Sequence, residues 1–351
     1  MGNGFFDEGR DGLVVGIGSA LVDILVPASD AFVATAGVPK GGMVYFDAPT
    51  IEAVVARCAQ KPQIAPGGAA CNTIVGIARL GGRTRFVGKR GEDDFGDLFE
   101  HDLQAQTVDP RLIRAALPTG RVLSLITPDC QRSMLTHLGA SGALRPDEVQ
   151  PADFIGAAVV LVEGYLVYNP SVFMHAIKIA RQAGALIALD LASFTVVEQN
   201  RKLLIDVVRD YVDIVVANED EAAVFTGKQQ EEKALSALAD LARLAVVKLG
   251  ARGSLIADGA VCQRITPMHG EKIVDTTGAG DLWAAGLLYG LVHGLPLETC
   301  GILASACGYE VCRVMGAGIP EDGWQRIRGM LDSRKGPVPG VVPKQASPIG
   351  R

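Results

Sequence analysis

The chain has 351 residues, of which 48% are hydrophobic, and this is enough to bury the core of one large domain or of two ordinary ones. Its 33 basic and 39 acidic residues give a net charge of −6 without any basic block, and no apolar run reaches about 18 residues, so we expect neither a nucleic-acid partner nor a membrane span. The first ten residues lack the apolar segment of a secretion signal, and the seven cysteines have no CxxC spacing. We therefore expect a cytoplasmic protein with reduced thiols.

The N-terminal part of the chain mixes extended and helical segments. Leu13–Ile17 is predicted as a strand and Gly37–Phe46 as extended structure, with a hairpin as one arrangement of it, and the apolar spacing predicts a helix over Ile51–Ala59. A turn at Gly67 and Gly68 leads into a second helix. The next two elements are a short strand over 83–88 and a helix over 95–106.

A predicted hairpin interrupts this pattern. Val122–Thr127 and Ser133–Leu138 are rich in β-forming residues and are separated by a short polar turn. The region over 20–48 is β-rich as well. The two regions are distant in sequence, but they could pair as one small sheet that covers a site.

After about residue 140, strands and helices alternate strictly. Ala157–Val162 is apolar at every position, which is typical of a strand buried on both faces. Such alternation predicts right-handed βαβ units and a mainly parallel sheet. Further strands are predicted over 185–190, 212–217, 244–248 and 253–257, and helices over 171–182, 201–209, 219–225, 231–243, 279–293 and 297–313.

These patterns predict an α/β fold with a central, mainly parallel sheet flanked by helices and a small β-sheet lid. The last 17 residues contain four prolines and three glycines, so we expect a disordered tail. We assign residues 1–17, 51–114 and 140–334 to the α/β core, residues 18–50 and 115–139 to a discontinuous β-lid, and residues 335–351 to the tail.

The most informative motif is Asp275–Asp281, which reads Asp-Thr-Thr-Gly-Ala-Gly-Asp and comes just before an apolar helix. Its glycines allow a tight turn, and the helix N-terminus supplies free N–H donors and partial positive charge, a combination suited to a phosphoryl group. Asp281 falls in the first helical turn, where it could accept the proton of an attacking hydroxyl. The alternative is an ordinary helix start with an acid placed favourably for the helix dipole.

Four motifs in order make the chain resemble the ribokinase-like (PfkB) carbohydrate kinase family. Asp275–Gly286 is similar to the C-terminal signature of that family, and Gly67–Thr73 with its following glycines is similar to the N-terminal one. Asn218–Glu221 resembles the Asn-x-x-Glu motif, and Lys248–Gly253 resembles the turn of the nucleotide strand. The resemblance implies the ribokinase-like fold and an ATP-dependent phosphotransferase that acts on a hydroxymethyl group of a nucleoside or sugar.

The resemblance also implies roles at the phosphate end. Asp281 would be the catalytic base, and the anion hole would consist of the backbone amides of Gly278, Ala279 and Gly280. Asn218 and Glu221 would organise Mg²⁺ through water, a role that suits a strongly hydrated cation. The same two residues also fit a helix capping box, and both interpretations can hold together.

The turn after Lys248 is expected to contact the nucleotide. We interpret Lys248 as a strand-end residue rather than as a phosphate ligand. The nucleotide contacts are assigned to the backbone of Gly250 and Gly253. The resemblance implies ATP and Mg²⁺ as cofactors and leaves a requirement for a monovalent cation such as K⁺ open.

At the acceptor end the resemblance points to the segment after the first strand and to the glycine turn. Asp23 would accept hydrogen bonds from vicinal hydroxyls, for which a carboxylate is well suited, with Ser19 beside it. Gly67 and Gly68 would let the acceptor lie against backbone, and Asn72 would bond another hydroxyl. The ordinary alternatives are an exposed turn acid for Asp23 and a helix N-cap for Asn72.

Within the family, the chain is most similar to the adenosine kinase-like branch. The residues that carry this are Gly37–Asp47, Thr119–Arg121, Gln131–Ala140 and Glu163–Leu166. The 5′-hydroxyl of adenosine is therefore our preferred acceptor, and Arg132 would reach over the phosphates from the hairpin. One departure is Ser19, because adenosine kinases usually carry Asn at that position.

Two other functions fit the same motifs. A free-sugar kinase acting on ribose, fructose or a keto-deoxy sugar acid, and a non-catalytic nucleoside or sugar sensor, both stay open. A dinucleotide-binding fingerprint at 16–21 lacks its third glycine and its distant acid, and no Walker motif occurs, so we reject both. We expect a small-molecule partner, with a monomer or a homodimer formed through the lid.

Overall fold

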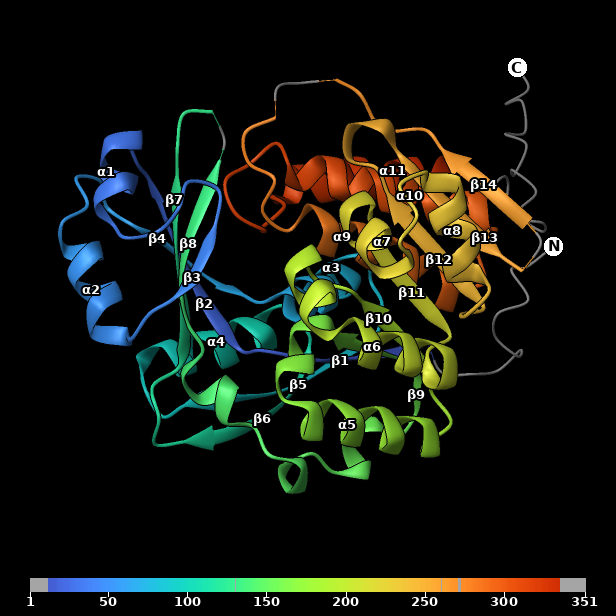
Figure 1. The fold of residues 1–351 in the computed structure, drawn as a ribbon, viewed down its shortest axis with the longest axis horizontal. Helices are drawn as coiled ribbons and strands as arrows, with labels where there is room; N and C mark the ends of the chain where they lie inside the picture. Colours follow the sequence, from blue (N-terminus) through green and yellow to red (C-terminus); the bar gives the residue numbers. More distant parts are fainter. Residues whose placement is uncertain (1–11, 130, 260, 271–272, 335–351) are drawn as a thin grey trace, which may run out of the picture.

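The computed structural model describes residues 12–129, 131–259, 261–270 and 273–334, and it contains two sheets (Figure 1). The larger sheet has nine strands in the order β14-β13-β12-β11-β10-β9-β1-β5-β6. The seven strands from β12 to β6 are parallel to one another, whereas β13 pairs antiparallel with both β12 and β14. This confirms the predicted mainly parallel sheet. Its strands are β1 (Leu13–Ile17), β5 (Thr84–Gly91), β6 (Asp109–Ala115), β9 (Ala157–Glu163), β10 (Leu186–Asp190), β11 (Ile214–Asn218), β12 (Leu244–Lys248), β13 (Ser254–Asp258) and β14 (Val261–Ile265).

Helices cover both faces of this sheet because its central strands are apolar on both sides. Every residue of β1 and β9 is buried. One face packs on α5 (Pro170–Gln182), α6 (Phe194–Tyr211), α7 (Glu219–Thr226) and α8 (Glu231–Ala239). The other face packs on α3 (Ala69–Arg79), α4 (Asp94–Ala105), α9 (Ala279–Val292), α10 (Leu297–Val311) and α11 (Glu321–Arg334).

The smaller sheet is the predicted lid, and it lies beside the main sheet (Figure 1). Its strand order is β3-β8-β7-β2-β4, so the two distant β-rich regions do pair with each other, through β2 and β7. Leu123 and Leu125 of β7 pack against α1 and α2, whereas Val122 and Ser124 face the main domain. The lid elements are β2 (Leu21–Pro27), α1 (Asp30–Thr35), β3 (Met43–Tyr45), α2 (Ala48–Ala56), β4 (Gln63–Gly67), β7 (Gly120–Ile126) and β8 (Arg132–His137).

Two predicted assignments need correction. The lid sheet includes β4, and α2 packs on the lid core through Ile51 and Val54, although residues 51–67 were assigned to the α/β core. The reason is that β4 pairs antiparallel with β2, a contact between strands about 40 residues apart that local pattern does not reveal. Gly37–Phe46 is not a hairpin, because β3 pairs parallel with β8. The predicted disordered tail lies outside the described residues.

The order in which strands are added to the main sheet reverses at β1. It first builds outward through β5 and β6, then returns to place β9 on the opposite side of β1. Ligands of open α/β sheets bind beyond the carboxyl ends of the strands at such a switch point. Residues at the carboxyl ends of β9, β10, β11 and β12 line one cleft together with residues of the lid, so the cleft lies between the main sheet and the lid.

Among the described residues, no helix has both the length and the apolar character that a membrane crossing requires.

Candidate active site

A cleft of about 970 Å³ runs along the carboxyl ends of the parallel strands, between the core and the lid. Its lining includes thirteen of the fourteen residues that the sequence singled out: Ser19, Asp23, Gly68, Asn72, Arg132, Asn218, Glu221, Gly250, Gly253, Gly278, Ala279, Gly280 and Asp281. The exception is Gly67, whose missing side chain makes room for another residue. A Cβ there would lie 2.4 Å from Asp23 Oδ2, so Gly67 positions Asp23 instead of lining the cleft.

The turn before α9 is held in place by Asp275. Its Oδ1 accepts from the backbone N–H and the hydroxyl of Thr277, at 3.0 and 2.8 Å, and its Oδ2 accepts from the Gly316 N–H at 2.8 Å. Gly278 then has a φ of 73°, which favours glycine, and α9 begins at the next residue. The Ala279 N–H donates to the Thr276 carbonyl at 3.1 Å, so Gly278 and Gly280 are the stronger candidates for anion-binding amides.

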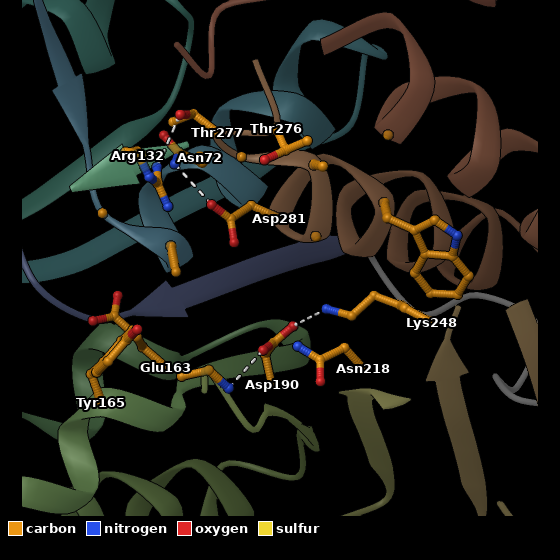
Figure 2. Close-up of a pocket in the computed structure, with 18 of the residues that line it drawn as sticks. Asn72, Arg132, Glu163, Tyr165, Asp190, Asn218, Lys248, Thr276, Thr277 and Asp281 are labelled. Carbon is orange, nitrogen blue, oxygen red and sulfur yellow. Dashed lines mark hydrogen bonds and ion pairs between the residues drawn. The ribbon is translucent and has the colours of Figure 1, made fainter. Parts of the chain in front are cut away.

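Asp281 lies in the first turn of α9 and is held by the helix that carries the N-terminal signature. Asn72 Nδ2 donates to Asp281 Oδ2 at 2.9 Å (Figure 2), and Thr73 Oγ1 donates to the Asp281 carbonyl at 3.1 Å. In this structure Asn72 therefore bonds the predicted base, whereas we expected it to bond the acceptor. The pKa of Asp281 is raised to about 6, mainly by burial and also by the Asp190 carboxylate, against the lowering effects of the Asn72 hydrogen bond and of nearby cations.

The lid supplies two charged groups to the cleft. Asp23, on β2, has its pKa raised to about 6 by burial, although the Arg132 guanidinium opposes this shift. Arg132, at the start of β8, donates through Nη1 to Thr277 Oγ1 at 3.0 Å, so the lid contacts the anion-binding turn directly (Figure 2). Asp23 and Arg132 thus line the same cleft as Asp281.

Glu163 is a buried carboxylate that sequence reasoning did not assign to the site. It ends β9 at the switch point, and its Oε2 accepts from the backbone N–H groups of Ser19 and Ala70 at 3.3 and 3.2 Å. Burial raises its pKa to about 7. Glu163 therefore ties the segment after β1 to the start of α3, and both segments carry candidate acceptor-binding residues. The signal in the sequence was an acid that ends an otherwise apolar strand.

Asp190 was not singled out from the sequence and Lys248 was interpreted as a strand-end residue only; each ends a buried parallel strand. Lys248 Nζ lies 3.0 Å from Asp190 Oδ2 (Figure 2). Burial alone would lower the pKa of Lys248, but the Asp190 and Glu221 carboxylates raise it. Both side chains face the cleft, and the sequence signal was again a charged residue at the end of an apolar strand.

The predicted capping box between Asn218 and Glu221 is present at the start of α7. Glu221 N–H donates to Asn218 Oδ1 at 2.8 Å, and Asn218 N and Nδ2 donate to the two Glu221 carboxylate oxygens at 2.8 and 2.7 Å. Burial raises the pKa of Glu221, whereas Lys248 lowers it. Gly250 and Gly253 lie close by in the turn between β12 and β13 and line the same end of the cleft.

These residues fit a hydrated Mg²⁺ better than a metal held directly by protein. Both Glu221 oxygens already accept hydrogen bonds, and within the described ranges no group of three or more His, Cys, Asp or Glu side chains has the arrangement of a metal site. Mg²⁺ retains several waters and commonly binds phosphates, so second-sphere carboxylates suit it. The donor set therefore agrees with the predicted water-mediated role.

The raised pKa of Asp281 leads to a pH prediction. A general base works as the carboxylate, so kcat should be constant well above pH 6 and should fall as the pH drops through about 6, where Asp281 becomes protonated. Steady-state kcat at saturating substrates, measured across this range, checks the prediction. The Asp23→Asn variant should keep this acid limb, because its base is intact, and a wild-type kcat that did not change through about pH 6 would contradict the prediction.

Comparisons with known proteins agree with the geometry. The model of the pfkB family of carbohydrate kinases matches residues 42–323. The chain is 32% identical over 289 residues to a probable fructokinase-4 of Arabidopsis thaliana, covering 76% of this chain and 88% of that protein. The solved structure of adenosine kinase from Sinorhizobium meliloti superposes with a TM-score of 0.84 at 34% identity, and that of a probable sugar kinase from Rhizobium etli CFN 42 with 0.85 at 32% identity. Each covers 90% of this chain and 98% of the other chain.

Proposed function

Because this chain belongs to the pfkB family of carbohydrate kinases, which transfer phosphoryl groups to alcohols, we propose that its acceptor is adenosine and that it phosphorylates the 5′-hydroxyl. Membership of this family makes the chain a kinase of a small sugar or nucleoside, and members of the family use ATP and Mg²⁺. The choice of adenosine within that class is our proposal.

In the proposed reaction, the oxygen of the acceptor hydroxyl attacks the γ-phosphorus of ATP while Asp281 takes the proton of that hydroxyl. The bond between the γ-phosphorus and the oxygen that bridges it to the β-phosphorus breaks, and ADP leaves with that oxygen. The Gly278 and Gly280 amides and the α9 N-terminus stabilise the charge on the phosphoryl group. Asn218 and Glu221 would hold the waters of a bound Mg²⁺, which would supply further charge neutralisation. Asn72 keeps the Asp281 carboxylate directed into the cleft.

The observation that carries the choice of adenosine is the apolar wall of the cleft near Asp23. Side chains from the lid and from the segment after β9 form this wall: Leu21, Met43, Val122, Met134, Leu138, Tyr165 and Leu166. A free sugar has no apolar face that needs so much hydrocarbon, whereas an adenine ring can pack on aliphatic and aromatic side chains. Tyr165, whose pKa is raised to about 12 by burial, is a neutral ring available for such stacking.

A free-sugar kinase is the second candidate, and the identity to the probable fructokinase-4 favours it. Ser19 points the same way, since its short side chain replaces the Asn usual beside the ribose in adenosine kinases. Against this, a bound fructose would occupy only the polar part of the cleft and would leave the apolar wall without a ligand.

Adenosine and ribose form a matched pair that tests the proposal, because they share the sugar and differ by the base. Measured kcat/KM values should favour adenosine by about 10²-fold or more, the scale expected when a purine-sized apolar group is buried. Other nucleosides and fructose complete the set. Equal values for adenosine and ribose would show that the wall does not bind a base, and a higher value for fructose would favour the second candidate.

The lid leads to a prediction about closure. Arg132 at the start of β8 already contacts Thr277 of the core, so acceptor bound in the cleft should hold this end of the β7–β8 hairpin closed on the core. We expect saturating adenosine to slow proteolytic cleavage within 128–132. Cleavage at an unchanged rate would contradict closure. A requirement for K⁺ and a dimer formed through the lid stay proposals.

A further inference from the structure

Lys248 lies close to the anion-binding turn, although its sequence context suggested no more than a strand end. Gly280 has no side chain, and a Cβ built there would lie 3.0 Å from Lys248 Nζ. The ammonium group therefore touches the first turn of α9, whose amides face the transferred phosphoryl group in the proposed reaction. A side chain at position 280 would require the ammonium group to shift.

The Lys248 side chain is fixed by a second anchored residue. Asp190 Oδ2 lies 3.0 Å from Nζ, and its Oδ1 accepts from the Ala192 N–H at 2.9 Å. Ala192 has a φ of 68°, which is unfavourable for a residue with a side chain, so this turn is held against local preference. The Ala192 N–H thereby orients the Asp190 carboxylate, which in turn holds the lysine toward the cleft.

The ammonium retains hydrogen-bonding capacity for a ligand. Among the residues that the structure describes, Asp190 is its one hydrogen-bond partner, whereas an ammonium has three N–H donors. The side chain is mostly buried, with 14% of its surface exposed, and that exposed part faces the cleft. A ligand oxygen in the cleft could therefore complete its coordination.

The charges around the cleft call for such a cation. The described residues that line it include seven carboxylates: Asp23, Glu163, Asp190, Glu219, Asp220, Glu221 and Asp281. Among those same lining residues, the lysine and arginine side chains are Lys248 and Arg132. Arg132 belongs to the lid, so Lys248 is the cation that the core itself presents to a polyphosphate, whether or not the lid is closed.

We propose that Lys248 is a phosphate-binding residue of this kinase, with its ammonium donating to an oxygen of the γ-phosphoryl group beside the Gly278 and Gly280 amides. The inference builds on the proposed phosphate site and is independent of which acceptor is used. The competing explanation is structural: Lys248 neutralises the buried carboxylates of Asp190 and Glu221 and never contacts nucleotide.

Binding measurements without turnover separate these two roles. Lys248→Met keeps the aliphatic stem and removes the charge, so it should raise the Kd of the non-hydrolysable ATP analogue AMPPNP by about ten- to a hundredfold, the scale of a hydrogen bond to a charged group. The Kd of ADP, which lacks the γ-phosphoryl group, should change much less. With a good acceptor, kcat should fall by about 10²-fold, as for the loss of one oxyanion donor.

A double variant controls for stability. Lys248→Met leaves the Asp190 carboxylate without its cation and should lower Tm, and adding Asp190→Asn should restore Tm by removing that charge. If Lys248 binds phosphate, AMPPNP affinity stays weak in the double variant. Lys202→Met on the exposed face of α6, which removes the same charge far from the cleft, should bind both nucleotides like wild type.

Three outcomes would overturn the proposal. They are an unchanged Kd for AMPPNP in Lys248→Met, equal weakening for AMPPNP and ADP, and recovery of AMPPNP affinity together with Tm in the double variant. None of them bears on Asp281, whose loss would still abolish fast turnover if the proposed reaction is correct.

Discussion

Replacing Asp281 with Asn should lower kcat by about 10²–10⁴-fold, the range over which general base catalysis contributes. The substitution keeps the size and polarity of the side chain, and the Asn72 contact can still form through the amide oxygen. What it removes is the group that accepts the proton of the attacking hydroxyl. Dissociation constants for AMPPNP and adenosine should stay close to wild type, because the glycine amides and Asp23 are unaltered.

The control for this variant is another acid in a first helical turn. Glu298 occupies that position in α10, is exposed and lies outside the cleft, so Glu298→Gln should leave kcat and both dissociation constants unchanged. If Asp281→Asn kept a near-normal kcat with its best acceptor, Asp281 would not be the base. The 275–281 motif would then be an ordinary helix start with a favourable acid.

Replacing Asp23 with Ala should have the opposite signature, with weak acceptor binding as the main defect. Asp23 lies beside Gly67 on the acceptor side of the cleft, and burial raises its pKa to about 6, so above that pH it is a desolvated charge. Loss of a buried charged hydrogen-bond partner should weaken acceptor binding by about 2–5 kcal/mol. The Kd of AMPPNP should change little.

Calorimetry with adenosine and with AMPPNP on the same preparation measures both effects. Asp23→Asn is the matched variant, because it retains a hydrogen-bonding group without the charge and should bind adenosine with intermediate affinity. Asp23→Ala with wild-type affinity for adenosine would remove Asp23 from the acceptor site. A loss of affinity for both ligands, together with a lower Tm, would indicate a structural role instead.

The fold could be predicted where local pattern and burial agree. Ala157–Val162 is apolar at every position because both faces of β9 are covered, and this marked the parallel sheet correctly. The edge strand β6 and the helix α11 were not predicted. β6 contains Pro110 and lacks strict alternation, because Leu112 and Ile113 are adjacent, and α11 is mostly polar, so neither carries a strong periodic signal.

The candidate site could be predicted where a motif is contiguous. The 275–281 turn was found because its residues are consecutive in the sequence. Asn72 was found because it lies within the contiguous Gly67–Thr73 signature. Glu163, Asp190 and Lys248 were not assigned, since they meet only through the strand order β12-β11-β10-β9-β1. The contact of Ser19 with Glu163 spans 144 residues, and no local pattern specifies it.

A competition reaction tests the central claim most directly. Wild-type protein is given equal concentrations of adenosine and fructose with Mg²⁺ and a limiting amount of ATP, and the phosphorylated products are quantified by mass spectrometry. We predict that adenosine 5′-monophosphate accounts for nearly all of the transferred phosphoryl groups, in a one-to-one ratio with ADP. A product mixture dominated by fructose phosphate, or ADP formed without any phosphorylated acceptor, would contradict the proposed function.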